Sequence, residues 1–246
     1  MGMPVGIDVR RPAVDPGPVL DRCYALLRRA DDVFSLWRRD TPMSRYAAGA
    51  AGLEEVPPEI AGVLALAHLA RLRTGGWFAA RRPDGTPDPT GIVKGWAVAR
   101  VADALDAAGL TSWCVNAAGD VCVRGAPAPG RPWHVGIADP RRPGAVADVV
   151  AVGGAGRAAV ATSGAAERGP HIWDPFTGRP AAADPLSVSV VCADPVRADV
   201  LATAAVARGP SCVAWLDAEP GVEALAIAAD GAETRTRGWP RGAAPA

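Results

Sequence analysis

The sequence is poor in lysine, asparagine and glutamine, and it lacks both a net charge and a long apolar run. Its 26 basic residues include one lysine, Lys94; its one asparagine is Asn116, and glutamine is absent. Arginine fills the other basic positions, as a compositional bias would produce. Because an ammonium and a planar guanidinium are not interchangeable, the retained lysine indicates a role that arginine does not fill. A lysine that escaped the bias by chance explains the same observation.

These absences exclude several classes of protein. The formal net charge is zero and no basic patch stands out, so we expect no nucleic-acid partner. No apolar run reaches the roughly 18 residues of a spanning helix, and the N-terminus lacks the pattern of a signal peptide. The five cysteines form no CxxC pair, which fits a reducing compartment. We therefore expect a cytoplasmic protein without a membrane span, whose thiols act as small hydrophobic groups.

Apolar periodicity and turn residues predict an α+β fold, with helices packed on a largely antiparallel sheet. We expect one domain over residues 1–240 and a frayed tail at 241–246. The predicted helices are 19–34, 58–73, 91–108 and 196–208. The predicted strands are 3–9, 112–115, 121–123, 133–137, 146–152, 158–162, 187–192 and 212–215. Residues 35–51 are expected to be irregular.

The segment 88–95, Asp-Pro-Thr-Gly-Ile-Val-Lys-Gly, is a candidate anion site. It places a loop of small residues at the start of a helix, where backbone N–H groups and the helix dipole favour an anion. Lys94 would face that anion one turn into the helix. The segment matches neither a Walker A loop nor a GxGxxG fingerprint. A helix N-terminus with an ordinary lysine accounts for the pattern equally well.

Two further segments carry groups that suit a phosphate ligand. His171 lies in a loop, His-Ile-Trp-Asp-Pro-Phe-Thr-Gly, and an imidazole can act as a general base. Asp199 and Thr203 are four residues apart on a predicted helix, so their oxygens share one face. A carboxylate and a hydroxyl are suitable Mg²⁺ ligands when phosphate and water complete the shell, although such a pair is more often a polar helix face. His68 and His134 are expected to be structural.

In this order, the segments resemble motifs of the FAD:protein FMN transferases, the ApbE family of flavin transferases. The likeness runs from Met1 to about Gly209 and includes further stretches. These are Met-Gly-Met at 1–3, the stretches 31–37 and 41–46, Gly-Trp-Phe-Ala at 76–79, Asn-Ala-Ala-Gly-Asp at 116–120 and Thr-Ser-Gly at 162–164. The resemblance implies a single ApbE-type, T-fold-like domain. Several ordered motifs are more specific than any one of them.

The resemblance also implies a reaction and a set of site residues. The FMN half of FAD would move onto a Thr or Ser hydroxyl of an acceptor flavoprotein, and AMP would leave. His171 would act as the base, and Mg²⁺ would be held by the backbone carbonyl of Gly91 and the side chains of Asp199 and Thr203. The residues implied to contact FAD are Met1, Trp37, Trp77, Phe78, Ala79, Asp88, Lys94 and Ile172.

The chain departs from the family pattern at several positions. Ala79 replaces an Asp, Ala118 replaces a Gly, and Pro89-Thr90 replaces Leu-Gly. The chain also begins at the first motif, which leaves the position of the true start open. Two alternatives use the same cavity: a Mg²⁺-dependent FAD pyrophosphatase that releases FMN and AMP, and a degenerate module that binds FAD without turnover.

Overall fold

A seven-stranded sheet and a two-stranded sheet form the β-structure of the computed structural model, which describes residues 2–164, 171–182 and 184–240. Met1 and the predicted tail at 241–246 lie outside the described residues. The strands are β1 (Val5–Val9), β2 (Trp113–Ala117), β3 (Asp120–Gly125), β4 (Trp133–Ala138), β5 (Val146–Val152), β6 (Gly154–Gly164), β7 (Ser187–Cys192), β8 (Glu223–Ile227) and β9 (Glu233–Arg235). The helices are α1 (Gly17–Phe34), α2 (Pro42–Ala47), α3 (Pro58–Arg73), α4 (Thr90–Ala107), α5 (Pro195–Arg208) and α6 (Cys212–Leu216), with 3₁₀ turns η1 (Leu53–Glu55) and η2 (Gly209–Ser211).

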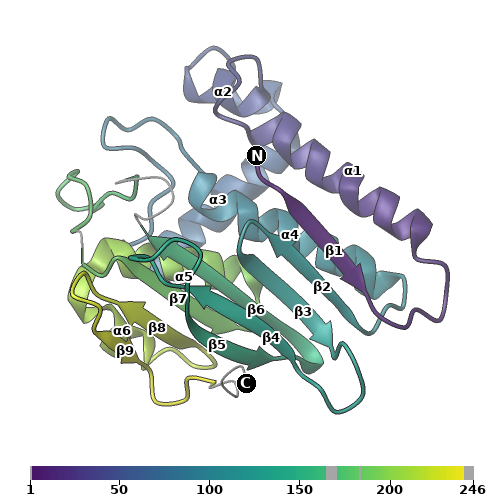
Figure 1. The fold of residues 1–246 in the computed structure, drawn as a ribbon. Helices are drawn as coiled ribbons and strands as arrows, with labels where there is room; N and C mark the ends of the chain where they lie inside the picture. Colours follow the sequence, from purple (N-terminus) through teal and green to yellow (C-terminus); the bar gives the residue numbers. More distant parts are fainter. Residues whose placement is uncertain (1, 165–170, 183, 241–246) are drawn as a thin grey trace.

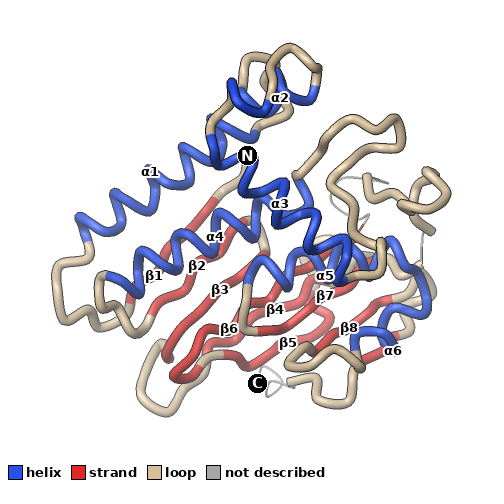
Figure 2. Tube along the Cα trace, turned by 180° about the vertical axis from the view of Figure 1, so that it is seen from behind, coloured by secondary structure: helices blue, strands red, loops and turns tan. Residues whose placement is uncertain are grey.

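The large sheet has the order β1-β2-β3-β6-β7-β8-β9, and all of its neighbouring strands are antiparallel. β4 and β5 form a separate antiparallel pair. The helices α1, α4 and α5 cover one face of the large sheet, and β4 and β5 lie over the other (Figure 1; Figure 2). The predicted α+β class is therefore confirmed.

Side-chain alternation along the central strands explains these layers. On β3, Cys122 points into the core beneath the helices, whereas Val121 and Val123 point into the core beneath β4 and β5. β6 alternates in the same way, with Ala159 on the helix side and Val160 on the other side. Because both faces are covered, these strands read as nearly continuous apolar runs, as the sequence indicates.

Proline and short polar residues set where the helices begin. Pro58 opens α3 and Pro195 opens α5, in the first turn, where the missing N–H has no helical partner to lose. The Asp194 carboxylate caps α5 and accepts from the amide of Val196 at 2.8 Å. These signals explain why the predicted and observed starts of α3 and α5 agree to within one residue.

The prediction of a strand at 212–215 is wrong, because this segment forms the short helix α6. Cys212 and Leu216 are buried in the helix-side core, and α6 follows directly on η2. A four-residue apolar run fits a buried strand or one helical turn equally well by pattern alone. Tertiary packing therefore decides its conformation.

The helix α2 and the strands β8 and β9 were not predicted. α2 lies within the stretch expected to be irregular, and Thr41 caps it by accepting from the amide of Ser44 at 3.2 Å. β8 and β9 extend the sheet beyond β7. The sequence of β8, Glu-Ala-Leu-Ala-Ile, is rich in residues with low strand propensity, so its pairing with β7 overrides the local preference.

The thiols agree with a further expectation. Cys23, Cys122, Cys192 and Cys212 are buried, and burial raises the pKa of the Cys122 thiol to about 12. These thiols act as small hydrophobic groups in the core. Within the described ranges, no helix combines the length and hydropathy needed to cross a membrane.

Helices α4 and α5 approach each other closely at Gly95. A Cβ added there would lie 2.6 Å from the carbonyl oxygen of Pro195 and 2.9 Å from the Cα of Val196. The Gly95 amide also donates to Asp199 Oδ2 at 2.8 Å. Glycine at this position thus allows α4 and α5 to cross with almost no side chain between their backbones.

We expect Gly95→Ala to lower the free energy of unfolding by about 1–3 kcal/mol, because the new methyl group meets backbone atoms that cannot rotate away. Gly62→Ala on α3 is the matched control, since an added Cβ there meets open space. That change should stabilise the protein by up to about 1 kcal/mol. Urea denaturation of the three proteins measures both effects, and equal stabilities of the two variants would contradict the packing argument.

Candidate functional site

One open cavity of about 1490 Å³ collects side chains from widely separated parts of the sequence. It lies where the start of α4, the middle of α5, the β2–β3 turn and the loop at 171–178 meet. The predicted site residues that the structure describes all line it: Trp37, Trp77, Phe78, Ala79, Asp88, Gly91, Lys94, His171, Ile172, Asp199 and Thr203. Met1 lies outside the described residues.

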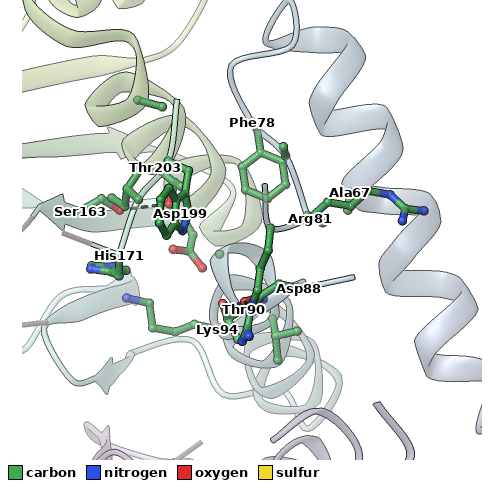
Figure 3. Close-up of a pocket in the computed structure, with 18 of the residues that line it drawn as sticks. Ala67, Phe78, Arg81, Asp88, Thr90, Lys94, Ser163, His171, Asp199 and Thr203 are labelled. Carbon is green, nitrogen blue, oxygen red and sulfur yellow. Dashed lines mark hydrogen bonds and ion pairs between the residues drawn. The ribbon is translucent and has the colours of Figure 1, made fainter. Parts of the chain in front are cut away.

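The facing surfaces of α4 and α5 form an oxygen-rich corner of the cavity (Figure 3). Asp199 is only 3% exposed, and its Oδ2 accepts from the Gly95 amide. The usual helical acceptor of that amide is the carbonyl oxygen of Gly91, which lies one turn earlier on α4. Thr203 is one turn further along α5, and a Cβ on Gly91 would lie 3.6 Å from its Cγ2. The two helices therefore bring Gly91, Asp199 and Thr203 together.

Ser163 belongs to the same corner, although no role was predicted for it from the Thr-Ser-Gly motif at 162–164. Its Oγ lies 3.1 Å from Thr203 Oγ1 (Figure 3). Among the described residues there is no cluster of three or more His, Cys, Asp or Glu side chains that would form an all-protein metal cage. One carboxylate with hydroxyl and carbonyl oxygens instead fits a hard cation such as Mg²⁺, which retains waters and binds substrate phosphates.

Lys94 pairs with a carboxylate on the neighbouring strand. Its Nζ lies 2.7 Å from Asp120 Oδ2, and Asp120 Oδ1 accepts from the amide of Thr162 at 3.1 Å. In Figure 3 the Lys94 side chain extends from α4 towards the side of the site where His171 lies. The one lysine of the chain thus lines the cavity with its ammonium held by a β3 carboxylate.

The turn between β2 and β3 presents Asp120 to Lys94. Asn116 Oδ1 accepts from the Gly119 amide at 3.0 Å, which closes the turn. Ala118 and Gly119 have φ values of +50° and +94°. Ala118 therefore takes a left-handed conformation that suits the glycine of the family motif better, at a cost of about 1–2 kcal/mol.

The Asp88 carboxylate closes a tight turn just before α4. Its Oδ1 accepts from the Thr90 amide at 3.1 Å and from the Thr90 hydroxyl at 2.6 Å, and its Oδ2 lies 2.9 Å from Arg82 Nε. The amide of Thr90 is thus already engaged, so the expectation of free N–H groups at this helix start does not hold for that position. Asp88 contacts the loop that forms the cavity rim.

Aromatic side chains form another part of the cavity wall. The Trp77 and Phe176 rings meet edge-on, with centroids 4.8 Å apart and planes at 71°. Phe78 is buried beneath Gly91, where an added Cβ would lie 3.3 Å from its ring. Trp37 is 87% exposed at the rim. Sequence motifs identified the tryptophans and Phe78, but the pairing of Trp77 with Phe176 depends on the tertiary fold.

The loop that carries His171 and Ile172 is held by its own hydrogen bonds. Asp174 accepts from the Phe176 amide at 2.8 Å, and this bond lowers the pKa of the Asp174 carboxyl below its ordinary value. The Ala181 amide donates to the Ile172 carbonyl at 2.9 Å. His171 is exposed to the cavity at the start of this loop, whereas Ile172 packs against the helix-side core.

The fold and the site define an α+β domain with one large cavity. Its lining includes an ammonium group, a carboxylate with hydroxyls, an imidazole and aromatic rings. The sequence model of the ApbE family matches residues 79–226, which is more than half of the chain. The chain therefore belongs to the ApbE family.

Proteins named FAD:protein FMN transferase are among its relatives. The one from Klebsiella pneumoniae is 28% identical over 182 residues, which are 70% of this chain and 51% of that protein. The one from Treponema pallidum is 39% identical over 158 residues, 56% of this chain and 42% of that protein. The chain thus spans about half the length of the curated relatives it matches.

Solved structures share the fold. The flavin transferase ApbE from Vibrio cholerae superposes with a TM-score of 0.79 at 24% identity, covering 96% of this chain and 94% of that one. The apo flavinyl transferase ApbE from Pseudomonas stutzeri gives a TM-score of 0.80 at 22% identity, with coverages of 96% and 93%. At these identities, the likeness establishes the architecture alone.

We expect Lys94→Met to destabilise the protein by roughly 1–3 kcal/mol at pH 7, because it removes one partner of a largely buried ion pair. The effect should fall below that of a fully buried pair, since the Lys94 side chain is 21% exposed. The double variant Lys94→Met/Asp120→Asn should recover part of the loss, because an asparagine still accepts from the Thr162 amide. Chemical denaturation of the parent protein, the two single variants and the double variant measures the coupling energy between the two side chains.

The exposed pair Arg237–Asp217, at 2.8 Å, provides the control. Arg237→Met should change the stability little, because exposed ion pairs are screened by solvent. Strictly additive effects of the Lys94 and Asp120 changes would show that the two side chains are not energetically coupled.

Proposed function

We propose that this chain is a Mg²⁺-dependent FAD:protein FMN transferase, which moves FMN from FAD onto a Thr or Ser hydroxyl of an acceptor flavoprotein and releases AMP. The observation that carries the proposal is that Lys94, His171 and the Asp199–Thr203 pair line one cavity, although they come from three distant segments. Membership of the ApbE family and the names of the matched relatives support the same reaction.

FAD would lie in the cavity with its pyrophosphate between Lys94 and the oxygen-rich corner of α4 and α5. The Lys94 ammonium would neutralise phosphate charge, and Asp88 would contact the adenosine portion. The planar rings would pack against the aromatic wall and its neighbours: Trp37, Trp77, Phe78 and Ala79. Ile172 would contact FAD through its backbone. Met1 belongs to the same proposed set but lies outside the described residues.

The side chains of Asp199 and Thr203 and the backbone carbonyl of Gly91 would hold Mg²⁺. Their oxygens suit this cation, and their number leaves coordination positions for phosphate and water. When bound, Mg²⁺ would supply the positive charge that neutralises the pyrophosphate. The Gly95 amide would keep the Asp199 carboxylate oriented through its 2.8 Å hydrogen bond.

His171 would accept the proton of the acceptor hydroxyl. The hydroxyl oxygen would form a bond to the phosphorus of the FMN half as the bond from that phosphorus to the AMP oxygen breaks. AMP would leave with the electron pair of that bond, and the Lys94 ammonium would hold the phosphates in place. Positioning and charge neutralisation would thus supply most of the catalysis, as is typical of phosphoryl transfer.

The hydrolase and the binding module differ from this proposal in one measurable respect each. Water in place of the acceptor hydroxyl would release FMN together with AMP, and the open cavity admits water. Ala79, Ala118 and Pro89 depart from the family pattern and favour a module that binds FAD without turnover. The products formed from FAD therefore distinguish all three.

The decisive experiment incubates the purified protein with FAD and Mg²⁺, with and without a candidate acceptor, and follows AMP release and in-gel flavin fluorescence. AMP together with a fluorescent acceptor band would establish the transferase. AMP with free FMN would establish the hydrolase instead. Bound FAD with no AMP under any condition would identify the binding module.

We expect His171→Ala to bind FAD as tightly as the parent protein but to lower the rate of AMP release by about 10²–10⁴-fold, because the proton acceptor is lost. His134→Ala is the matched control, since His134 is exposed on β4 and does not line the cavity. Unchanged AMP release by the His171 variant would remove this residue from the mechanism.

We expect Asp199→Asn to weaken Mg²⁺ binding, because an amide is a poorer ligand than a carboxylate for a hard cation. Raising the Mg²⁺ concentration should therefore restore part of the AMP release. Asp103→Asn on the exposed part of α4 serves as the control and should leave the Mg²⁺ dependence unchanged. A Mg²⁺ titration of AMP release measures the shift, and identical titration curves would argue against Asp199 as a ligand.

A further inference from the structure

The last residue of α5, Arg208, lies between two indole rings. Its guanidinium carbon is 5.4 Å from the Trp77 ring centroid and 5.4 Å from the Trp215 ring centroid. Trp77 lines the cavity, whereas Trp215 belongs to α6 and does not line it. Arg208 thus connects the helix that carries Asp199 to one ring of the cavity wall.

The Arg208 guanidinium contacts the two rings but leaves one of its donors without a hydrogen bond among the described residues. Its Nε atom is buried and has no hydrogen-bond partner within the part of the chain that the structure describes. A buried donor without a partner is unfavourable, so this placement needs a compensating interaction. The flat guanidinium supplies one, because its faces stack on aromatic rings in a way that an ammonium cannot reproduce.

Trp77 packs in part against the apolar core around α3 and α4, and Arg208 adds a contact to the end of α5. Trp77 follows Gly75 and Gly76, which have φ values of +60° and +93°. Its other aromatic neighbour, Phe176, is 59% exposed and belongs to the loop at 171–178. The contact with Arg208 therefore ties the indole to a helix of the core, whereas Phe176 ties it only to an exposed loop.

We propose that Arg208 is a positioning residue that holds the Trp77 indole in the cavity wall, where the indole packs against a planar ring of the substrate. The identity of that substrate as FAD rests on the proposed function. The shared chemistry is a flat heteroaromatic ring, either the flavin or the adenine. Arg208 itself acts through Trp77 and contacts no reacting atom.

The first test needs no ligand and follows the indole N–H signals in a ¹⁵N–¹H NMR spectrum. Trp77→Leu identifies the Trp77 signal by its disappearance. Arg208→Met keeps the length of the side chain but removes the stacked cation, and it should shift or broaden that signal. Arg208→Lys should do so nearly as strongly. An unchanged Trp77 signal in Arg208→Met would overturn the inference.

Arg100→Met is the matched control. The Arg100 guanidinium lies 5.2 Å from the Trp96 ring centroid, but neither residue lines the cavity. This variant removes a cation–π contact of the same kind from α4. It should leave the Trp77 signal and FAD binding unchanged.

The second test measures FAD binding in the presence of Mg²⁺ for the same variants. Arg208→Met should raise the Kd about tenfold and leave the rate of AMP release at saturating FAD unchanged, because a ground-state contact is lost. In a Trp77→Leu background the Arg208 change should have no further effect. Full additivity, or unchanged FAD affinity in Arg208→Met, would contradict an action through Trp77.

Titrations with FMN and with AMP distinguish the two rings. A loss of FMN affinity in Arg208→Met assigns the indole to the flavin, and a loss of AMP affinity assigns it to the adenine. If the parent protein binds none of these ligands, the proposed function fails, and the ligand half of the inference is overturned with it. The NMR signal still decides separately whether Arg208 positions Trp77.

Discussion

The near contact of α4 with α5 at Gly95 is the constraint on which the site depends. Two helix backbones meet there with almost no side chain between them, and the Gly95 amide donates to the Asp199 carboxylate at 2.8 Å. A residue with a side chain at this point would separate the helices and move Asp199 and Thr203 away from Gly91. Lys94 precedes Gly95, so the same crossing also fixes the direction of the ammonium towards β3. Gly95 therefore helps to position both the Asp199 carboxylate and the Lys94 ammonium at the cavity.

Most of the fold was predictable because its elements carry strong local signals. The Val-rich segments of β5 and β7 gave the observed bounds, since β-branched residues between turns favour strands. Pro58 and Pro195 located two helix starts. The failures lie where the local signal is weak or contradictory. The segment Cys212–Leu216 is too short to distinguish a strand from a helix, and β8 forms because β7 offers an edge to a segment that has little strand propensity of its own.

The candidate site also has features that local sequence patterns predict and others that they do not. Ordered motifs selected Lys94, His171 and Asp199 as candidates, because each motif lies within one continuous segment of the sequence. The structure places all three candidates at one cavity. Contacts between segments cannot be predicted from local patterns, because no periodicity links residues that meet only after folding. Asp120 as the partner of Lys94 and Arg208 as the neighbour of Trp77 are of this kind. Composition hinted at the contact between Lys94 and Asp120. Lys94 is the one lysine of the sequence, and the turn that precedes Asp120 contains its one asparagine.

The size of the cavity bears on which product the site would form. Small-molecule sites commonly enclose about 300–1,000 Å³, and this cavity of about 1490 Å³ is larger and open. A bound dinucleotide would therefore leave part of the cavity unfilled, with room for a second reactant. Water fills such room by default, so transfer to a protein requires that the acceptor exclude water as it docks. The same His171 would then serve hydrolysis or transfer, and the fit of the acceptor at the mouth of the cavity, rather than any further catalytic group, would decide between them.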